Sequence, residues 1–194
     1  MLKVTKFTTA MLINTALCAL LNSSFLAAQT RSDESSKFFC GEPLAQAKSL
    51  DNIVPTLYQI VSGPAGSKRD WKLMGQLFAP TATIAPVFHE NGQPKIKLLT
   101  VNEFISLNEE LFKDIGFFET EVDSQIIQVG HMATVISLYE SREAPQNSPY
   151  SRGINSFQLL NDGRRWCVIS VTWDSDKGLH FIPNQIVTTK ALAF

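Results

Sequence analysis

The stretch SRGINSFQLLNDGRRWCVISVTWDSD, residues 151–176, decides the fold because it contains two apolar runs joined by Asp162-Gly163. Both central residues of a two-residue type I′ loop need a positive φ, which Gly adopts freely and Asp tolerates. The stretch therefore predicts a hairpin of two long antiparallel strands. With that loop, Arg152 lies opposite Trp173.

A second strand pair is expected over residues 116–143, with its turn at Gly130. Acidic residues of its first strand alternate with apolar and small ones, which is typical of a strand with one solvated face. Glu140 and Arg142 on the next strand have the parity to pair with these acids across the ladder. We therefore expect a structural charge network that includes Glu119, Glu121 and Asp123.

Two helices are expected before these strands. Apolar residues recur at helical spacing from Ile53 to Val61, with Asp51 as the cap of this first helix. Ser67 and Asp70 have the form of a capping box that opens a second helix, and the apolar face of that helix includes Trp71. Pro80 ends the second helix.

A short hairpin and a third helix follow. Residues 81–88 and 95–99 predict two strands that turn at Asn91-Gly92. Thr100 and Glu103 form another capping box, and the helix that they open ends near Gly116. The expected order is two helices, a short hairpin, a helix and four long strands.

Composition indicates one globular domain without an electrostatic signature for nucleic acid. The chain has 194 residues, a hydrophobic fraction of 44%, and 17 basic against 18 acidic residues. This length is enough for a single sizeable core. Since the basic residues form no cluster, we expect no nucleic-acid partner.

The N-terminus has the pattern of a secretory signal. Lys3 and Lys6 precede a largely apolar segment over residues 10–21, and small residues lead to Ala28, after which we expect cleavage. An uncleaved anchor is the alternative. We expect a signal peptide over 1–28, a flexible leader over 29–50, a domain over 51–183 and a tail over 184–194. Export then predicts a periplasmic or secreted protein with no stable membrane span after cleavage.

Two cysteines remain after cleavage, Cys40 and Cys167. An oxidising compartment would allow them to form a disulfide. We expect them to be unpaired, because Cys167 has the position of a small buried strand residue and Cys40 lies on the leader.

The order of elements resembles the nuclear transport factor 2-like superfamily, which includes SnoaL-like proteins and ketosteroid isomerases. The resemblance covers about residues 51–183 and implies an α+β fold: a cone-shaped α+β barrel in which three N-terminal helices pack in a strongly curved, mostly antiparallel sheet around a pocket. A narrower resemblance is to an exported bacterial subgroup without established activity. It rests on SKRDW at 67–71, GFFE at 116–119, YESR at 139–142, RGINS at 152–156 and GRRW at 163–166.

Ketosteroid isomerases of this superfamily use a carboxylate base on the strand after the second helix, and a Tyr on the first helix with a protonated acid as an oxyanion hole. Residues 81–88 contain no Asp or Glu. We therefore do not expect proton abstraction by that route. Tyr58 on the first helix is either an oxyanion donor or an aromatic residue of the pocket wall.

The candidate pocket lies between the first two helices and the concave face of the sheet. Asp70 is either a helix cap or a general acid or base, and Arg152 either stacks on Trp173 or binds a ligand carboxylate. Ligand-binding candidates at the walls are Tyr58, Trp71, Tyr139 and Trp173, and candidate polar contacts are Asp70, Arg152 and Asn155.

We expect neither a metal nor a cofactor. The three histidines are more than 40 residues apart, and no phosphate-binding loop, nucleophile elbow or dinucleotide fingerprint occurs. The expected function is therefore binding of a small apolar or amphipathic molecule. The alternatives are an isomerase, dehydratase or cyclase-like enzyme that acts on such a molecule, and a protein-interaction module that uses the sheet face. We also expect a homodimer through the outer face of the sheet.

Overall fold

The computed structural model describes residues 39–177 and 185–186, so the expected signal peptide lies outside the described residues. The chain divides into two units between Phe39 and Cys40, and the helices and strands of the fold belong to the unit that begins at Cys40. None of the helices within the described ranges is long and apolar enough to span a membrane.

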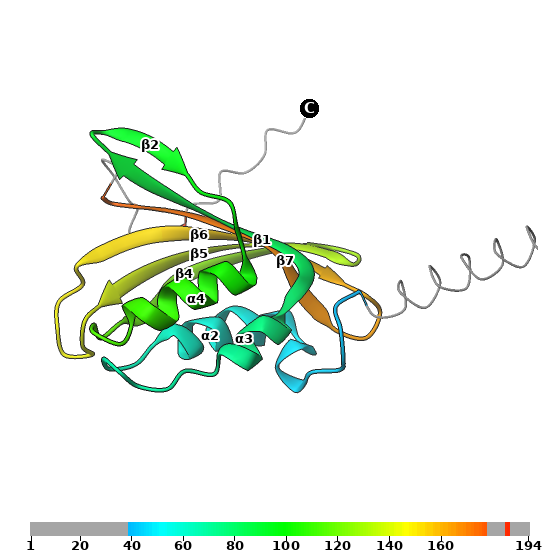
Figure 1. Ribbon diagram of the computed structural model, residues 1–194. Helices are drawn as coiled ribbons and strands as arrows, with labels where there is room; N and C mark the ends of the chain where they lie inside the picture. The colour runs from blue at the N-terminus through cyan, green and yellow to red at the C-terminus, as the bar shows by residue number, and fades with distance from the viewer. Residues whose placement is uncertain (1–38, 178–184, 187–194) are drawn as a thin grey trace, which may run out of the picture. The chain divides into compact units, whose positions relative to one another are not determined.

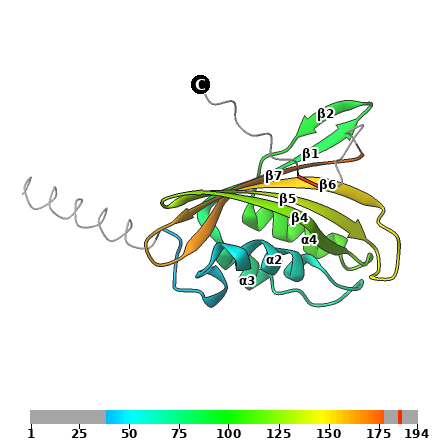
Figure 2. The same cartoon turned by 180° about the vertical axis from the view of Figure 1, so that it is seen from behind.

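Three α-helices and a 3₁₀ helix precede or interrupt the strands. They are the 3₁₀ helix η1 (Ala45–Ala47), α2 (Leu50–Val61), α3 (Trp71–Leu77) and α4 (Val101–Leu111). Figures 1 and 2 show α2, α3 and α4 on the same side of the sheet. The apolar face of α2 is buried against one face of the sheet, whereas α4 has no fully buried residue and contributes partly buried ones such as Phe104.

The described strands form one mixed, mostly antiparallel sheet with the order β2-β1-β7-β6-β5-β4, in which β3 pairs with β1. Only the pairing of β1 with β7 is parallel among these. This arrangement confirms the expected α+β fold of three helices on a curved sheet. The strands are β1 (Phe78–Glu90), β2 (Gln93–Ile96), β3 (Leu99–Thr100), β4 (Phe118–Val129), β5 (Met132–Arg142), β6 (Ser151–Asn161) and β7 (Trp166–Ser175).

Helix starts agree only in part with the capping residues that the sequence indicates. The box of Thr100 and Glu103 is present at α4, with both hydrogen bonds formed. At α3 the N-cap is Asp70, whose side chain accepts a hydrogen bond from the Leu73 N–H at 2.9 Å. The expected box with Ser67 is wrong, because the helix starts one residue after Asp70. At α2 the N-cap is Ser49, and Asp51 lies in the first turn.

The hairpin of β6 and β7 has a longer loop than the two-residue turn that we expected. Asn161 pairs with Trp166, so residues 162–165 form the loop. The Asp162 carboxylate holds it by accepting hydrogen bonds from the N–H groups of Arg164 and Arg165, at 3.0 and 3.2 Å. An Asp that accepts from the backbone two and three residues later stabilises such a turn without a type I′ loop.

A bulge between Gln158 and Leu159 shifts the register of this hairpin further. Asn155 therefore lies opposite Trp173, and the expected pairing of Arg152 with Trp173 is wrong. Asn155 is buried on the face that the helices cover, whereas Arg152 lies on the opposite face. Since successive side chains alternate between faces, the register decides which of these polar residues points towards the helices.

Cys40 and Cys167 form a disulfide, which corrects our expectation of two free thiols. Their Cα atoms are 5.5 Å apart and both residues are buried. The segment before α2 packs on the protein, since Ala47 is fully buried and the Cys40 N–H donates to Asp162. The folded unit thus includes residues 40–50, which we had assigned to a flexible leader.

Candidate functional site

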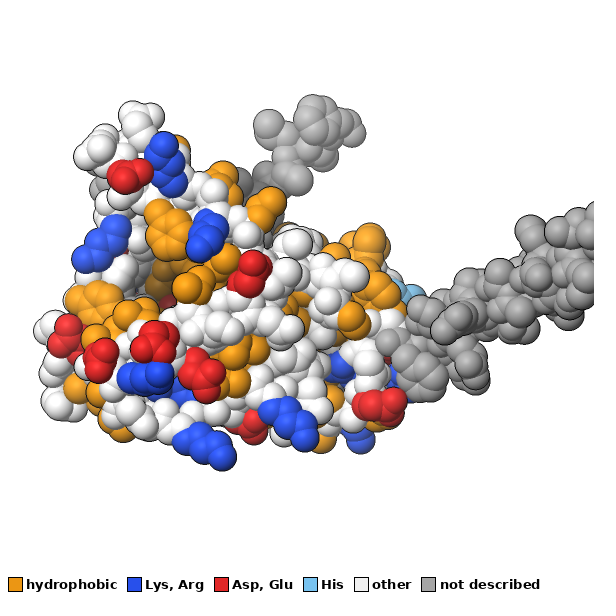
Figure 3. Space-filling view, viewed as in Figure 1, with side chains coloured by type: hydrophobic (Ala, Val, Ile, Leu, Met, Phe, Trp, Pro, Cys, Tyr) orange, Lys and Arg blue, Asp and Glu red, His pale blue; other side chains and the backbone are white. Residues whose placement is uncertain are grey.

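A cavity of about 350 Å³ lies between the three helices and the face of the sheet that they cover. Most of its wall is apolar and aromatic, and its polar groups come mainly from β4 to β7. Figure 3 shows a hollow bordered by hydrophobic side chains, on the side where the β1–β2 hairpin and α4 approach each other. The apolar lining is Leu57, Val61, Met74, Phe78, Ile84, Phe104, Phe112, Phe117, Phe157, Val171 and Trp173, and the polar lining includes Tyr58, Asn108, Glu119, Tyr139, Ser141, Tyr150, Ser151, Asn155, Ser175 and Lys177.

Four of the residues that we expected at a pocket line this cavity together. Tyr58 comes from α2, Tyr139 from β5, Asn155 from β6 and Trp173 from β7. Their strands are neighbours, with Tyr139 next to β6 and Asn155 directly opposite Trp173. The rings of Trp173 and of Phe104 from α4 form a T-shaped contact, with the ring centres 6.0 Å apart. These contacts connect the helices to the sheet at the cavity.

The Tyr58 hydroxyl belongs to a chain of hydrogen bonds. It accepts from the Asn155 amide at 2.9 Å and lies 2.6 Å from the Ser137 hydroxyl. Ser137 in turn donates its hydrogen to Glu121, which also accepts from Ser124. Because Ser137 has one hydrogen and gives it to the carboxylate, the hydrogen between Tyr58 and Ser137 is that of the phenol. The hydroxyl hydrogen of Tyr58 is therefore already bonded within the protein.

Glu119 is the functional candidate that our sequence reasoning missed. It lies near the start of β4, where its N–H donates to the Ser62 hydroxyl at 2.9 Å. Gly63 and Phe117 form a bridge beside it, so the end of α2 is tied to the start of β4. We expected Glu119 on a solvated strand face. It lies instead on the face that the helices cover, and its carboxylate lines the cavity.

Burial raises the pKa of Glu119 to about 7, because the charged carboxylate loses hydration. The hydroxyl of Ser141 opposes this shift by donating to one oxygen of the carboxylate at 3.3 Å. No ion pair joins Glu119 to a Lys, Arg or His of the described residues. Near neutral pH the cavity therefore contains an acid that exists in both protonation states.

Tyr139 contributes a hydroxyl that makes no hydrogen bond to the described residues. Its side chain lies over Gly153, its direct neighbour on β6. A Cβ atom at Gly153 would lie 2.3 Å from the Tyr139 oxygen and 2.5 Å from the carbonyl oxygen of Asp174. Only a glycine at this position leaves room for the phenol. Burial, followed by the negative charge of Glu119, raises the pKa of Tyr139.

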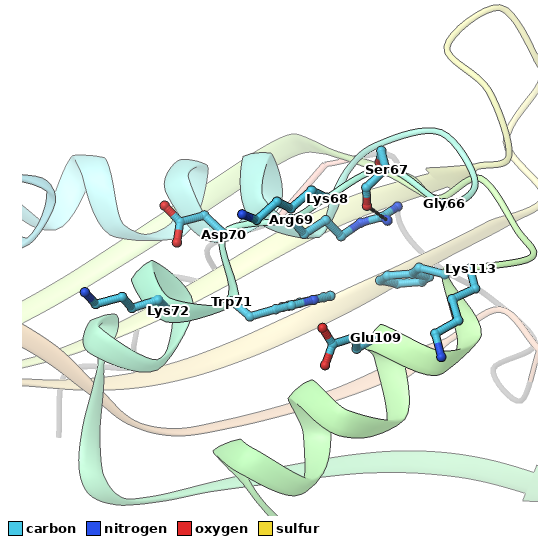
Figure 4. Close-up of a pocket in the computed structure, with 10 residues that line it drawn as sticks. Gly66, Ser67, Lys68, Arg69, Asp70, Trp71, Lys72, Glu109 and Lys113 are labelled. Atoms are coloured by element: carbon cyan, nitrogen blue, oxygen red, sulfur yellow. Dashed lines mark hydrogen bonds between the residues drawn. The ribbon is translucent and has the colours of Figure 1, made fainter.

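Trp71 and Asp70, two further candidates, lie at a different place. They line an open hollow of about 740 Å³ on the outer side of α3 and α4. Figure 4 shows Asp70 and Lys72 pointing away from the Trp71 ring. That ring stacks on Phe112, which separates the hollow from the cavity. Asp70 is occupied as the cap of α3, so we do not place it at a catalytic centre.

Arg152 also lies away from the cavity. On the outer face of the sheet, its Nε is 3.2 Å from Glu140, and the same carboxylate binds Arg142. A charge network is therefore present on β5 and β6, but it is not the one that we expected. It joins Glu140 to two arginines on the outer face and does not include the acids of β4, Glu119, Glu121 and Asp123. The hypothesis that Arg152 reaches into the pocket is wrong because the register turns it outward.

The described residues offer no cluster of three or more His, Cys, Asp and Glu side chains that could hold a metal ion. His89 is close to one acid, with its Nε2 2.9 Å from Asp174, near the C-terminal ends of β1 and β7. The residues that line the cavity can form hydrogen bonds, exchange a proton at Glu119 and make contacts through aromatic rings.

Comparison of the sequence with known protein families found no match, and no curated protein matches it either. Solved structures do match. A protein of unknown function with a cystatin-like fold from Nostoc punctiforme PCC 73102 superposes with a TM-score of 0.52 at 11% identity, over 69% of this chain and 97% of that one. An NTF2-like protein of unknown function from Pseudomonas putida KT2440 gives a TM-score of 0.51 at 13% identity, over 64% and 82%. The chain therefore has the fold of nuclear transport factor 2-like proteins.

Proposed function

We propose that the cavity binds a small amphipathic molecule. The apolar body of this ligand lies against the aromatic wall around Phe104 and Trp173, and its polar group lies at Glu119 and Tyr139. The observation that carries the proposal is a largely apolar cavity with polar atoms that the described protein does not use: the Tyr139 hydroxyl and one carboxylate oxygen of Glu119.

The size and lining of the cavity support this function. Ligand pockets usually have volumes of about 300 to 1,000 Å³ and few polar groups in an apolar wall, and this cavity has about 350 Å³. The Tyr58 hydroxyl is already bonded to Asn155 and Ser137. It therefore holds the wall in place and leaves ligand contacts to Glu119 and Tyr139.

An enzyme is the second candidate, and the pKa of Glu119 favours it. A carboxyl group with a pKa of about 7 suits a general acid or base at neutral pH. Such an enzyme would be an isomerase, a dehydratase or a cyclase that moves a proton of the bound molecule. Replacement of Glu119 by Gln would then lower turnover by about 10² to 10⁴ with ligand still bound.

A fluorescent probe tests the binding function. N-phenyl-1-naphthylamine, a neutral aromatic dye, should brighten on binding to the wild-type protein. Ser175→Phe adds a ring to a residue that lines the cavity, and it should abolish this signal. Ser156→Phe makes the same change on the outer face of the neighbouring strand and should keep it. Equal signals from both variants would contradict the proposal and favour an interaction module that uses the sheet.

Export and dimer formation remain proposals of their own. The tripartite N-terminus supports a periplasmic or secreted protein, and a mature N-terminus at residue 29 by mass spectrometry would agree with this. A retained Met1 in a cytoplasmic fraction would contradict it.

Exposed apolar residues at the far end of β4 and β5, such as Val129 at 66% and Met132 at 57% exposure, support a homodimer through the sheet. Light scattering that finds only monomer would oppose the dimer.

A further inference from the structure

Glu119 is the acidic residue among the described residues that line the cavity, which also contains several aromatic rings. It forms no ion pair with a Lys, Arg or His of the described residues. We propose that the polar group of the ligand is a cationic amine, bound between the Glu119 carboxylate and these rings. This inference rests on the proposed binding function and specifies the chemical class of the ligand.

The charge balance of the cavity is the first argument. Glu140 on the outer face pairs with two arginines, whereas the Glu119 carboxylate has only the hydroxyl of Ser141 as a hydrogen-bond partner among the described side chains. A buried carboxylate that lacks a counter-charge is unfavourable unless it is neutralised. A proton can neutralise it, and so can an ammonium group of the ligand.

The rings around Glu119 are the second argument. Tyr58, Tyr139 and Tyr150 line the same cavity, and the pKa of each is raised by burial and next by the negative charge of Glu119. All three phenols therefore lie within electrostatic range of the carboxylate. Aromatic faces attract ammonium groups through their quadrupole, and cages of such rings recognise quaternary ammonium ligands.

Lys177 supplies the third argument, and its ammonium group also competes with a ligand amine for the aromatic rings of the cavity. Its ammonium lies 6.0 Å from the centre of the Tyr150 ring, at a residue that lines the cavity. The protein thus already places one ammonium group against an aromatic ring of this site. A ligand amine would occupy the position closer to Glu119, where no Lys or Arg of the described chain forms an ion pair.

The opposing possibility is a neutral ligand whose carbonyl accepts a hydrogen bond from protonated Glu119. The two classes have opposite pH dependence. An amine needs the ionised carboxylate, so its affinity should increase as the pH rises through about 7, where Glu119 titrates. A carbonyl ligand should lose affinity over the same range. Tyr58, Tyr139 and Tyr150 face Glu119 and stay protonated there because their pKa values are raised, while Glu121 and Lys177 are the other charged groups near it.

Three probes with one apolar body and different polar groups test the proposal: 4-phenylbutylamine, 4-phenylbutanol and 4-phenylbutyrate. Their affinities for the full-length chain are measured by titration calorimetry at pH 8, and for the amine and the alcohol also at pH 5.5. We expect the amine to bind at least about tenfold more tightly than the alcohol, and the acid to bind most weakly. The affinity of the amine should fall by about tenfold or more at pH 5.5, and that of the alcohol should not.

Glu119→Gln should remove the preference for the amine over the alcohol. Glu140→Gln, the same replacement on the outer face, should keep the preference. If the alcohol binds at least as tightly as the amine, and Ser175→Phe abolishes its binding, the ligand is not a cation. In that case only this inference fails. A preference for the amine that survives Glu119→Gln would also overturn it. If none of the probes binds, the binding function fails with it.

Discussion

The hydroxyl oxygens of Tyr58 and Ser137 lie 2.6 Å apart and join α2 to the middle of β5. Because Ser137 donates to Glu121, the phenol hydrogen is shared with Ser137, and Asn155 donates to the phenol oxygen. Both groups are buried. A buried hydroxyl whose donor and acceptor are satisfied stabilises the arrangement of its helix and strands.

Tyr58→Phe should therefore reduce the free energy of unfolding by about 1 to 3 kcal/mol, since it leaves Asn155 and Ser137 without a buried partner. Urea unfolding followed by circular dichroism measures this loss. Ligand affinity should change little, because the phenol hydrogen does not face the ligand. A stable variant that has lost all binding would show that Tyr58 contacts the ligand directly.

The raised pKa of Glu119 makes stability depend on pH. Between its ordinary value of 4.5 and the folded-state value of about 7, the folded protein binds more protons than the unfolded chain. The stability contribution of Glu119 is thus fully present below pH 4.5 and is lost as the pH rises through 7. Glu119→Gln has no such loss, so its stability relative to wild type should increase between pH 4.5 and 8 by about 1 to 3 kcal/mol.

Urea unfolding of both proteins across this range measures the difference. Replacement of the exposed Glu90 by Gln is the control, and its stability relative to wild type should not follow the same curve. A difference between Glu119→Gln and wild type that does not change with pH would show that Glu119 is ionised throughout.

Gly153 makes room for Tyr139, so Gly153→Ala should destabilise the protein. The added Cβ would lie 2.5 Å from a backbone carbonyl oxygen that cannot move without the strand. Overpacking of this kind costs about 1 to 3 kcal/mol. Gly75→Ala in α3 is the matched control, because a Cβ there meets nothing within 4 Å. It should be neutral or stabilise the helix by up to about 1 kcal/mol, and equal effects in thermal unfolding would contradict this account.

The disulfide between Cys40 and Cys167 closes a loop over a sequence separation of 127. On the chain-entropy model, its removal should lower the free energy of unfolding by about 4 to 5 kcal/mol. The double variant Cys40→Ala with Cys167→Ala measures this in urea. Labelling of the unfolded, unreduced wild-type protein should find neither of these two thiols free, and free thiols at both positions would contradict the pairing.

The sequence predicted the elements of the fold well because their signals are local. The capping box at Thr100, the turn at Gly130 and the apolar spacing of α2 each depend on residues a few positions apart. The hairpin loop at Asp162 was mispredicted because the same Asp-Gly pair allows a second local turn, in which the carboxylate accepts from the N–H groups of Arg164 and Arg165. The carboxylate also accepts from Cys40, a residue far away in the sequence, and such a bond has no local pattern.

The candidate site was predictable only where it depended on residue type. Large aromatic residues at the cavity, such as Tyr58 and Trp173, could be expected from the fold. The role of Glu119 could not, because an acid that alternates with apolar residues looks the same on either face of an edge strand. Its one signal was that it follows Gly116-Phe117-Phe118, an apolar start that brings β4 against the end of α2.

Native mass spectrometry of the protein purified from its own cells tests most directly whether the cavity binds a small molecule. Wild type and Ser156→Phe should both carry a non-covalent adduct of a few hundred daltons, as a cavity of about 350 Å³ allows. Ser175→Phe, which fills the cavity, should lack it. An adduct that Ser175→Phe retains, or no adduct with wild type under conditions that keep the protein folded, would contradict the account.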